Sequence, residues 1–186
     1  MTSLRIENIV ATGDLDIQIN YSDVLDSVDL PHLRYDPDIH QGLELRFSEE
    51  GPLVTLYATG KYIIRAPSLE LLSETREKTL NLFSEIGLLD NAQDVAFKIN
   101  NVVGSGSIGR EVALAPLEED LAIGETAYDP DNFPALRCKL DEHDATVLLY
   151  RSGKVIITGA DSVEKDEAAY EEFQSALDEL FNVEHQ

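Results

Sequence analysis

The sequence predicts an α+β protein of two similar halves, in which helices cover one face of an antiparallel sheet and leave the other face open. The main observation is an internal repeat at a constant offset of 93 residues. Tyr-Asp-Pro-Asp at 35–38 returns at 128–131, and Gly-Lys at 60–61 returns at 153–154. The repeat predicts a pseudo-two-fold molecule with halves at residues 1–93 and 94–186. Such symmetry suits a two-fold partner, of which duplex nucleic acid is one.

Each half shows the same order of elements. Alternating segments rich in β-branched residues predict strands, and the Asp-Pro-Asp turn follows one of them because proline fixes φ. Amphipathic periodicity predicts a long closing helix in each half, with Ser68 and Ser162 as N-caps. The expected strands are residues 4–12, 43–47, 54–57 and 62–65, then 96–105, 136–140, 146–150 and 155–158; short helices are expected near 22–28 and 112–121.

Charge and composition argue against several classes of protein. The chain carries 36 acidic and 14 basic residues, and its net charge of −22 argues against nonspecific nucleic-acid binding. No stretch approaches the roughly 20 apolar residues of a membrane span. No signal peptide is visible, so we expect a cytosolic protein. One cysteine excludes an internal disulfide and a cysteine-cluster metal site.

Catalytic, cofactor and metal chemistry have little support in the sequence. Gly-Ser-Gly-Ser-Ile-Gly at 104–109 has the spacing of a dinucleotide fingerprint, but the parallel βαβ context that this fingerprint needs is missing. The Asp-Pro-Asp turns lack the further ligands of a calcium loop, and the histidines show no ligand spacing. No serine, histidine and acid arrangement can be read from the chain. We expect no cofactor, no metal and no enzymatic activity.

Several segments resemble the archaeal TATA-box-binding protein family. They are Asn-Ile-Val at 8–10, Tyr-Asp-Pro-Asp-Asn-Phe-Pro at 128–134 and Leu-Leu-Tyr-Arg-Ser-Gly-Lys-Val-Ile-Ile-Thr-Gly-Ala at 148–160. The resemblance covers nearly the whole chain and is more specific in the second repeat. It implies a ten-stranded saddle with helices on its convex face. The concave face of such a saddle opens the DNA minor groove, and phenylalanine wedges kink the duplex at both ends.

In the second repeat, the resemblance implies a complete DNA-binding face. Asn101 is expected to donate to minor-groove acceptors, where A·T and T·A look alike. Phe133, followed by Pro134, matches one wedge, and Tyr150 replaces the phenylalanine of the other. The remaining groove contacts are expected from Val103, Leu148, Ile156 and Thr158, and the phosphate contacts from Lys139, Ser152 and Lys154.

The first repeat departs from the family at the wedges. His40 and Gln41 stand where the family has phenylalanine followed by a small residue or proline, so we expect a weaker kink at that end. Tyr57 replaces the phenylalanine of the second wedge. Thr55 stands where the family has an apolar residue, and Arg65 stands where it has threonine. Arg65 adds charge that can read the shape of a narrow, A·T-rich groove. The family pattern is kept at the groove positions Asn8, Val10 and Ile63 and at the phosphate positions Arg46, Thr59 and Lys61.

Basic residues gather in the segments that the resemblance assigns to the saddle. Ten of the 14 lie in these strands and turns: Arg5, Arg34, Arg46, Lys61, Arg65, Lys98, Arg137, Lys139, Arg151 and Lys154. The alternative interpretation is that the helices simply present solvated charge and the strands do not. The acidic excess resembles that of proteins from salt-loving archaea.

The resemblance also implies partners. In the family, the second-repeat turn before the wedge binds transcription factor B, and Asp129, Asp131 and Asn132 occupy that turn here. We expect a monomer or weak dimer at the nucleoid, with double-stranded promoter DNA and transcription factor B as direct partners and RNA polymerase as an indirect one. The expected function is a general transcription initiation factor that binds and bends A·T-rich promoter DNA. The alternative is a divergent paralogue with weak or altered DNA preference that acts mainly through protein contacts.

Overall fold

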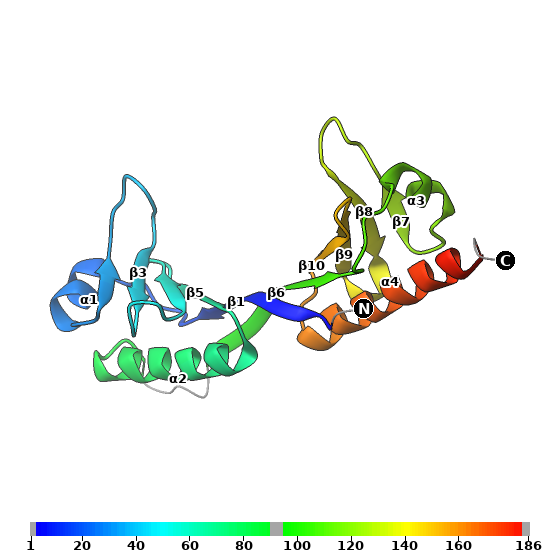
Figure 1. Ribbon diagram of the computed structural model, residues 1–186. Coiled ribbons are helices and arrows are strands. Elements are labelled where there is room, and N and C mark those ends of the chain that lie inside the picture. Colours follow the sequence, from blue (N-terminus) through cyan, green and yellow to red (C-terminus); the bar gives the residue numbers. More distant parts are fainter. Residues whose placement is uncertain (1–2, 90–94, 184–186) are drawn as a thin grey trace. The chain divides into compact units, whose positions relative to one another are not determined.

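The computed structural model describes residues 3–89 and 95–183 (Figure 1). The strands are β1 (Arg5–Asp14), β2 (His32–Arg34), β3 (Leu43–Arg46), β4 (Leu53–Leu56), β5 (Lys61–Ala66), β6 (Ala96–Ser107), β7 (Glu125–Ala127), β8 (Ala135–Leu140), β9 (Ala145–Tyr150) and β10 (Lys154–Thr158). The α-helices are α1 (Tyr21–Ser27), α2 (Leu69–Glu85), α3 (Leu114–Asp120) and α4 (Val163–Val183). None of these helices is long and apolar enough to cross a membrane.

The described strands form one ten-stranded sheet in the order β2-β3-β4-β5-β1-β6-β10-β9-β8-β7. Read from the two ends, β2-β3-β4-β5-β1 and β7-β8-β9-β10-β6 have the same connectivity. In both series, the pairs from the edge strand to the long first strand of the repeat are antiparallel. The predicted α+β class and the two structural repeats are confirmed.

The chain divides into two compact units that exchange strand ends. The first unit comprises residues 8–100, and the second unit combines the residues up to 7 with those from 101 onward. Within the first unit, Thr12 donates a hydrogen bond to Asn100 Oδ1 at 2.8 Å. Within the second unit, Ser105 donates to Glu7 Oε1 at 2.6 Å. Each unit therefore holds the beginning of the other repeat's long strand. The predicted boundary between residues 93 and 94 lies outside the described residues.

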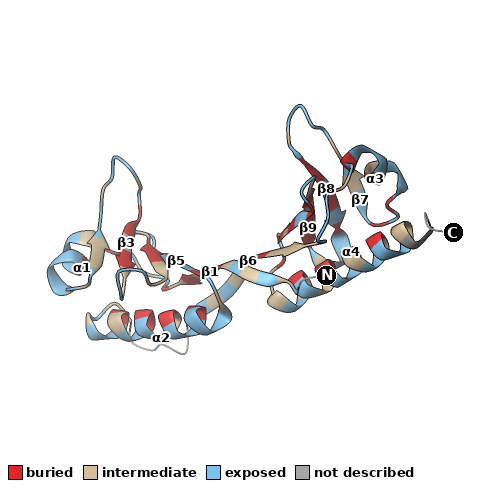
Figure 2. Cartoon of the chain, in the orientation of Figure 1, coloured by how far each residue is buried: buried red, intermediate tan, exposed pale blue. Residues whose placement is uncertain are grey.

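Each unit buries one sheet face against a long helix (Figure 2). In the first unit, Tyr62 of β5 and Phe83 of α2 are fully buried, with ring centroids 5.7 Å apart. In the second unit, Ile157 of β10 and Phe173 of α4 are fully buried. Burying one such side chain stabilises the fold by about 1.5–3 kcal/mol. Each long helix therefore contributes a buried aromatic side chain to the core of its unit.

Serine caps start both long helices, as predicted. Ser68 Oγ accepts a hydrogen bond from Leu71 N at 3.2 Å, and Ser162 Oγ accepts one from Lys165 N at 3.2 Å. These bonds satisfy amide groups that have no partner inside the helix. The caps are 94 residues apart, since 162 − 68 = 94, whereas the preceding strands repeat at 93. The second repeat therefore has one extra residue between β10 and α4.

The glycine-rich segment of β6 lets α4 approach the sheet. A Cβ atom on Gly104 would lie 2.5 Å from Asp166 Oδ2, and one on Gly106 would lie 2.5 Å from the Tyr170 hydroxyl. A side chain at either position would push the helix away from the strand. Helix packing therefore explains the first two glycines of the segment that resembles a dinucleotide fingerprint, and a positive φ of 76° explains Gly109.

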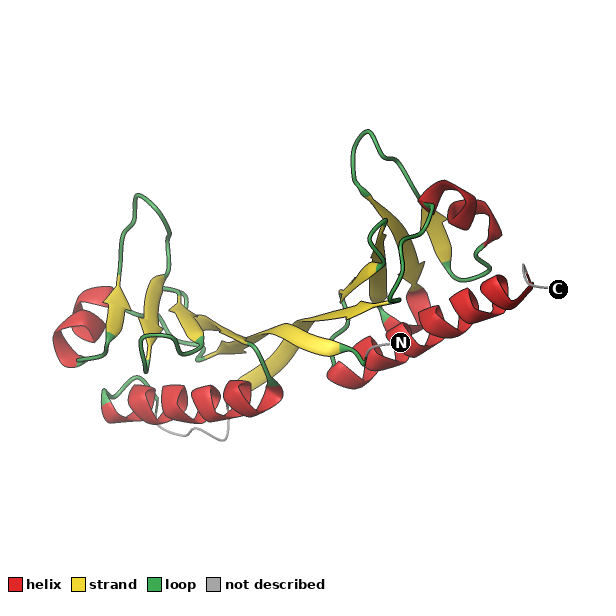
Figure 3. Ribbon diagram, in the orientation of Figure 1, coloured by secondary structure: helices red, strands yellow, loops and turns green. Residues whose placement is uncertain are grey.

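The sheet face opposite α2 or α4 is the open face of each unit, and Figure 3 shows each long helix along one side of its strands. Alternation along the strands separates the two faces. On β5, Tyr62 and Ile64 are buried toward α2, while Ile63 is partly exposed and Arg65 is exposed. Side chains on the open face are therefore available to a ligand.

Candidate nucleic-acid interface

The open face of the second unit is an apolar stripe that ends in basic side chains. Across β8, β9, β10 and β6, the pairing aligns Arg137, Leu148, Ile156 and Ser105 in one row. The adjacent row contains Lys139, Thr146, Thr158 and Val103. The apolar side chains in these rows are partly exposed, and both basic residues are exposed. A partner that meets this face thus encounters apolar contacts at its centre and positive charge at its β8 edge.

Asn101 has a fixed orientation on this face. Its Oδ1 accepts hydrogen bonds from Gly159 N at 2.8 Å and from Thr158 Oγ1 at 3.2 Å. Because the side-chain carbonyl is occupied, the Nδ2 amino group remains to donate to a ligand. The residue predicted to read groove acceptors therefore has its donor group available.

The predicted wedge residues Phe133 and Tyr150 lie together. Their ring centroids are 6.4 Å apart, with the ring planes tilted by 55°. The Arg137 guanidinium lies over the Phe133 ring at 4.7 Å. Phe133 N donates to Asp129 O at 2.8 Å, so the Asp-Pro-Asp turn positions the ring, and Pro134 follows as an exposed residue. The result is a partly exposed aromatic pair with a cation against it.

The first unit has the same rows with different chemistry. One row aligns Glu44, Thr55, Ile63 and Thr12, and the other aligns Leu53, Arg65 and Val10. Thr55 is fully buried, and Arg65 Nη1 donates to Thr55 Oγ1 at 3.3 Å. Thr55 thus offers no surface to a ligand, and the expected direct contact from it is wrong. Arg65, which was also expected at the groove, is exposed.

His40 and Tyr57 take the places of the aromatic pair in the first unit. Their ring centroids are 5.9 Å apart with a 55° tilt, close to the arrangement of Phe133 and Tyr150. Gly42 N donates to His40 Nδ1 at 2.9 Å, which fixes the imidazole ring against its own loop. Gln41 is exposed beside it. The backbone thus keeps the wedge geometry, while the histidine replaces an apolar ring with a polar one.

Asn8 lacks the hydrogen bonds that hold Asn101. Arg65 and Ala66 stand at the positions of Thr158 and Gly159, and no described residue bonds to the Asn8 side chain. The two asparagines therefore occupy equivalent strand positions, but hydrogen bonds fix the side-chain orientation of Asn101 and not that of Asn8.

The predicted phosphate contacts fall into a free group and an engaged group. Thr59 and Ser152 lie in the β4–β5 and β9–β10 turns, and Lys61 and Lys154 are the first residues of β5 and β10. All four are exposed, and neither lysine has an acidic partner among the described residues. Lys139 instead pairs with Asp141 at 2.7 Å, and this contact raises the pKa of Lys139. Arg46 donates to the Gly51 carbonyl.

In the predicted partner-binding loop, the side chains of Asp129 and Asp131 have different surroundings. Asp129 Oδ1 accepts from Asp131 N at 3.2 Å, and Asp129 Oδ2 accepts from the Asn132 side chain. The Asp131 carboxylate is exposed and has no partner among the described residues. Asp129 thus stabilises the turn, and Asp131 is left available.

Sequence reasoning missed Glu44 as an open-face residue. It lies 93 residues before Arg137 and occupies the same place in the row. The two repeats therefore have opposite charge at this point. The signal was available in the repeat offset, but the strand register is needed to place the residue on a face.

Comparison with known proteins identifies the family. The family described as transcription factor TFIID (or TATA-binding protein, TBP) matches residues 3–86 and 96–180, which correspond to the two repeats. The chain belongs to the TATA-binding protein family.

Relatives and a solved structure agree with this family. The chain is 37% identical to TATA-box-binding protein C of Halobacterium salinarum over 96% of this chain and 99% of the relative. It is 33% identical to the TATA-box-binding protein of Thermococcus celer over 95% and 90% of the two chains. The structure of the Methanococcus jannaschii TATA-binding protein superimposes with a TM-score of 0.75 and 27% identity, covering 96% of this chain and 99% of that one. The chain thus resembles archaeal members of the family, including one from a halophile.

Proposed function

We propose that the chain is a general transcription initiation factor that binds A·T-rich promoter DNA in the minor groove and bends it. The observation that carries this proposal is Asn101, whose carbonyl oxygen is held by Gly159 N and Thr158 within a partly exposed apolar stripe. A fixed amide donor suits the acceptors of adenine N3 and thymine O2, which A·T and T·A pairs present alike. The apolar neighbours suit the sugars and the groove floor.

In this proposal, Phe133 and Tyr150 supply the wedge that kinks the duplex. Unstacking one base step costs a few kcal/mol, and the buried aromatic surface and the wrapped DNA offset this cost. The Arg137 guanidinium beside Phe133 meets the negative potential of the groove. Lys61 and Lys154 contact phosphates and set the register without reading sequence.

We further propose that the loop at Asp131 binds transcription factor B and so brings RNA polymerase to the promoter indirectly. The exposed Asp131 carboxylate supports this role, because Asp129 already stabilises the turn. A basic side chain on the partner would pair with Asp131. The side chain of Asn132 is exposed, but its amino group donates to Asp129 and is therefore engaged within the loop.

Titration of labelled A·T-rich and G·C-rich duplexes at low and molar salt, with bending read by end-to-end energy transfer, tests the DNA proposal. Asn101→Asp should abolish binding, because it places a carboxylate against groove acceptors. Asn81→Asp makes the same chemical change on the exposed side of α2 and should leave binding unchanged.

Two results would contradict the DNA proposal. If Asn101→Asp binds DNA as the unaltered chain does, the open face is not the DNA surface. If the unaltered chain binds neither duplex at either salt concentration, the alternative role through protein contacts replaces it.

A further inference from the structure

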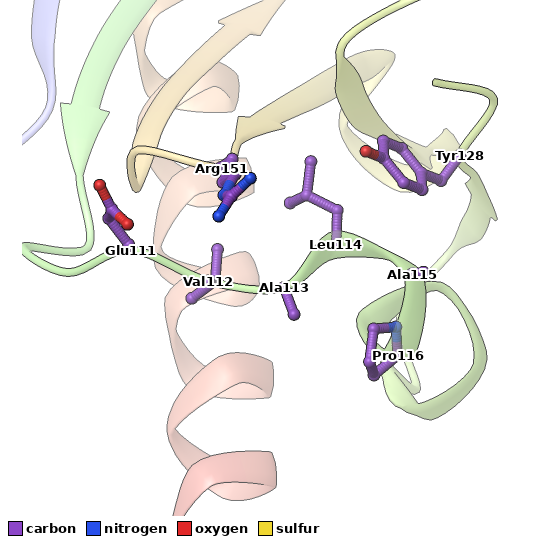
Figure 4. Close-up of a pocket in the computed structure, with 8 residues that line it drawn as sticks. All are labelled: Glu111, Val112, Ala113, Leu114, Ala115, Pro116, Tyr128 and Arg151. Atoms are coloured by element: carbon purple, nitrogen blue, oxygen red, sulfur yellow. The ribbon is translucent and has the colours of Figure 1, made fainter. Parts of the chain in front are cut away.

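The second unit has an open cavity of about 450 Å³ beside the start of α3 (Figure 4). In Figure 4 the side chains of Leu114, Tyr128 and Arg151 point toward a common space, and Val112 lies at its border. The cavity lies away from the open-face rows. It is lined by Glu111, Val112, Ala113, Leu114, Ala115, Pro116, Tyr128 and Arg151.

The first repeat shows which group fills the equivalent position. Tyr21 lies 93 residues before Leu114, and its ring centroid is 4.5 Å from that of Tyr35, the counterpart of Tyr128. The Tyr21 hydroxyl donates to Gln41 O at 2.9 Å and to Leu56 O at 3.2 Å. The first unit thus fills this place with a phenol ring from its own chain.

The backbone around the two positions is the same. Ile19 N donates to Ala58 O at 2.9 Å in the first unit, and Val112 N donates to Arg151 O at 3.0 Å in the second. Tyr21 and Leu114 are both the first residue of their helix. The cavity lies where Leu114 replaces Tyr21, and leucine has neither the ring nor the hydroxyl of tyrosine.

A second replacement adds a cation at the rim. Arg151 stands where the first repeat has Ala58, is exposed, and has no acidic partner among the described residues. Arginine side chains elsewhere in this chain stack on aromatic rings, as Arg110 does on Phe181 at 3.4 Å. A guanidinium over an aromatic face is favourable by about 0.5–1 kcal/mol at exposed sites.

We propose that this cavity receives one aromatic side chain of a partner protein, which takes the place that Tyr21 fills in the first unit. The ring packs against Tyr128 on one side and under the Arg151 guanidinium on the other. The acidic surroundings, Glu111 and the exposed Glu119 and Asp120 of α3, suit basic residues flanking that aromatic residue. The proposal does not rest on DNA binding or on the role proposed for Asp131.

Two capped tripeptides test the proposal by NMR titration of the Tyr128 ring signals. The probe acetyl-Lys-Tyr-Lys-amide should bind, and acetyl-Lys-Leu-Lys-amide, which has the same charge, should bind about tenfold or more weakly because it has no ring. Leu114→Tyr should abolish binding of the first probe, because the chain then fills its own cavity. Tyr21→Leu should create a second site, read from the Tyr35 ring.

Several outcomes overturn the proposal. Equal affinity for the two probes would show attraction by charge alone, and unchanged binding by a folded Leu114→Tyr variant would place the probe elsewhere. If the amide spectrum shows that this variant does not fold, the Arg151→Ala variant tests whether the probe occupies the cavity. This change restores the first-repeat residue and should weaken the tyrosine probe severalfold while leaving the leucine probe unchanged. Equal effects on both probes would contradict the aromatic site.

Discussion

At the scale of single residues, the two repeats place the same asparagine in different surroundings. Asn101 has its side-chain carbonyl held by two donors, whereas Asn8 has none among the described residues. Ordering a side chain costs conformational entropy, and for Asn101 this cost is met on folding. Asn8 must meet it when a ligand binds. The second unit therefore presents its asparagine donor at a lower entropy cost than the first.

The wedge positions give a prediction about asymmetric bending. Phe133→Ala should reduce DNA affinity by about tenfold or more and lower the bend, because a buried phenylalanine contributes a few kcal/mol. His40→Ala should cost less, because the imidazole is bonded to Gly42 N and has little apolar area to insert. Binding and energy-transfer measurements on one A·T-rich duplex make the comparison. Equal losses would remove the claim that the second repeat dominates the kink.

The partner loop gives a second prediction. Asp131→Arg should weaken the ternary complex with transcription factor B and DNA by severalfold, because it reverses an exposed, unpaired charge. Binary DNA affinity should stay nearly constant, and gel shifts with and without the partner measure both. Asp38→Arg makes the same change in the first-repeat turn and should leave the ternary complex intact. A parallel loss of binary binding would indicate damage to the turn.

Residue identities in the site were predictable where the repeat or the family motif supplied them. The equivalence of Asn8 and Asn101 and the pairing of Phe133 with Tyr150 follow from the sequence alone. The burial of Thr55 could not be predicted, because it depends on neighbours from other strands and loops, such as Arg65 and Gly42, that lie against its side chain. The conformation of a long side chain such as arginine depends on its three-dimensional surroundings, which the pattern of residue types along the chain does not specify.

At the scale of elements, α4 carries a buried acid where α2 carries a leucine. With the 94-residue offset between the helices, Asp166 corresponds to the buried Leu72. Asp166 is fully buried, and neither carboxylate oxygen has a hydrogen-bond partner in the structure. Burial, together with a smaller contribution from the nearby Glu167, raises its pKa to about 7. The adjacent Lys165 pairs instead with Asp144 and Asp161, so it does not offset this charge.

Asp166 should make the free energy of unfolding depend on pH. The folded pKa lies above the ordinary value of 3.8, so the folded chain holds a proton that the unfolded chain releases. Stability is therefore highest below that ordinary value, falls as pH rises through about 7, and levels off above it. The full difference is on the order of 4 kcal/mol, from about three pKa units at 1.36 kcal/mol each.

Substitution by the first-repeat residue tests this linkage. Asp166→Leu should remove most of the difference between urea unfolding at about pH 5 and about pH 8, and should stabilise the protein at the higher value. Asp178→Leu changes an exposed acid on the same helix and should leave the difference in place. An unchanged pH dependence in Asp166→Leu would assign it to other groups.

Most elements were predictable because their signals are local. Period-2 strands and serine caps depend on neighbouring residues, and both appear where expected. The long strands β1 and β6 end two residues later than predicted, at Asp14 and Ser107. They continue because Gly13 pairs with Tyr62 and Gly106 pairs with Val155 in the sheet. Pairing with a distant strand overrides the local preference of glycine for turns.

At the scale of the whole chain, two similar repeats carry unequal charge on their open faces. The second presents Arg137 at the position where the first presents Glu44, within a chain of net charge −22. If DNA binds the open faces as proposed, this position attracts the phosphates in the second repeat and repels them in the first. The family matches both repeats, so the two repeats differ in charge at this position although they belong to the same family.

The exchange of strand ends has a consequence for the history of the duplication. Residues 3–7 pack with the second unit, and residues 96–100 pack with the first. A chain of one repeat could build neither unit alone, because each needs a strand segment from another copy. Two such chains would complete each other reciprocally, as in segment-swapped homodimers. Fusion of two copies would turn this mutual dependence between molecules into one within a single chain, and each copy would then be free to change separately, as His40 and Phe133 have done.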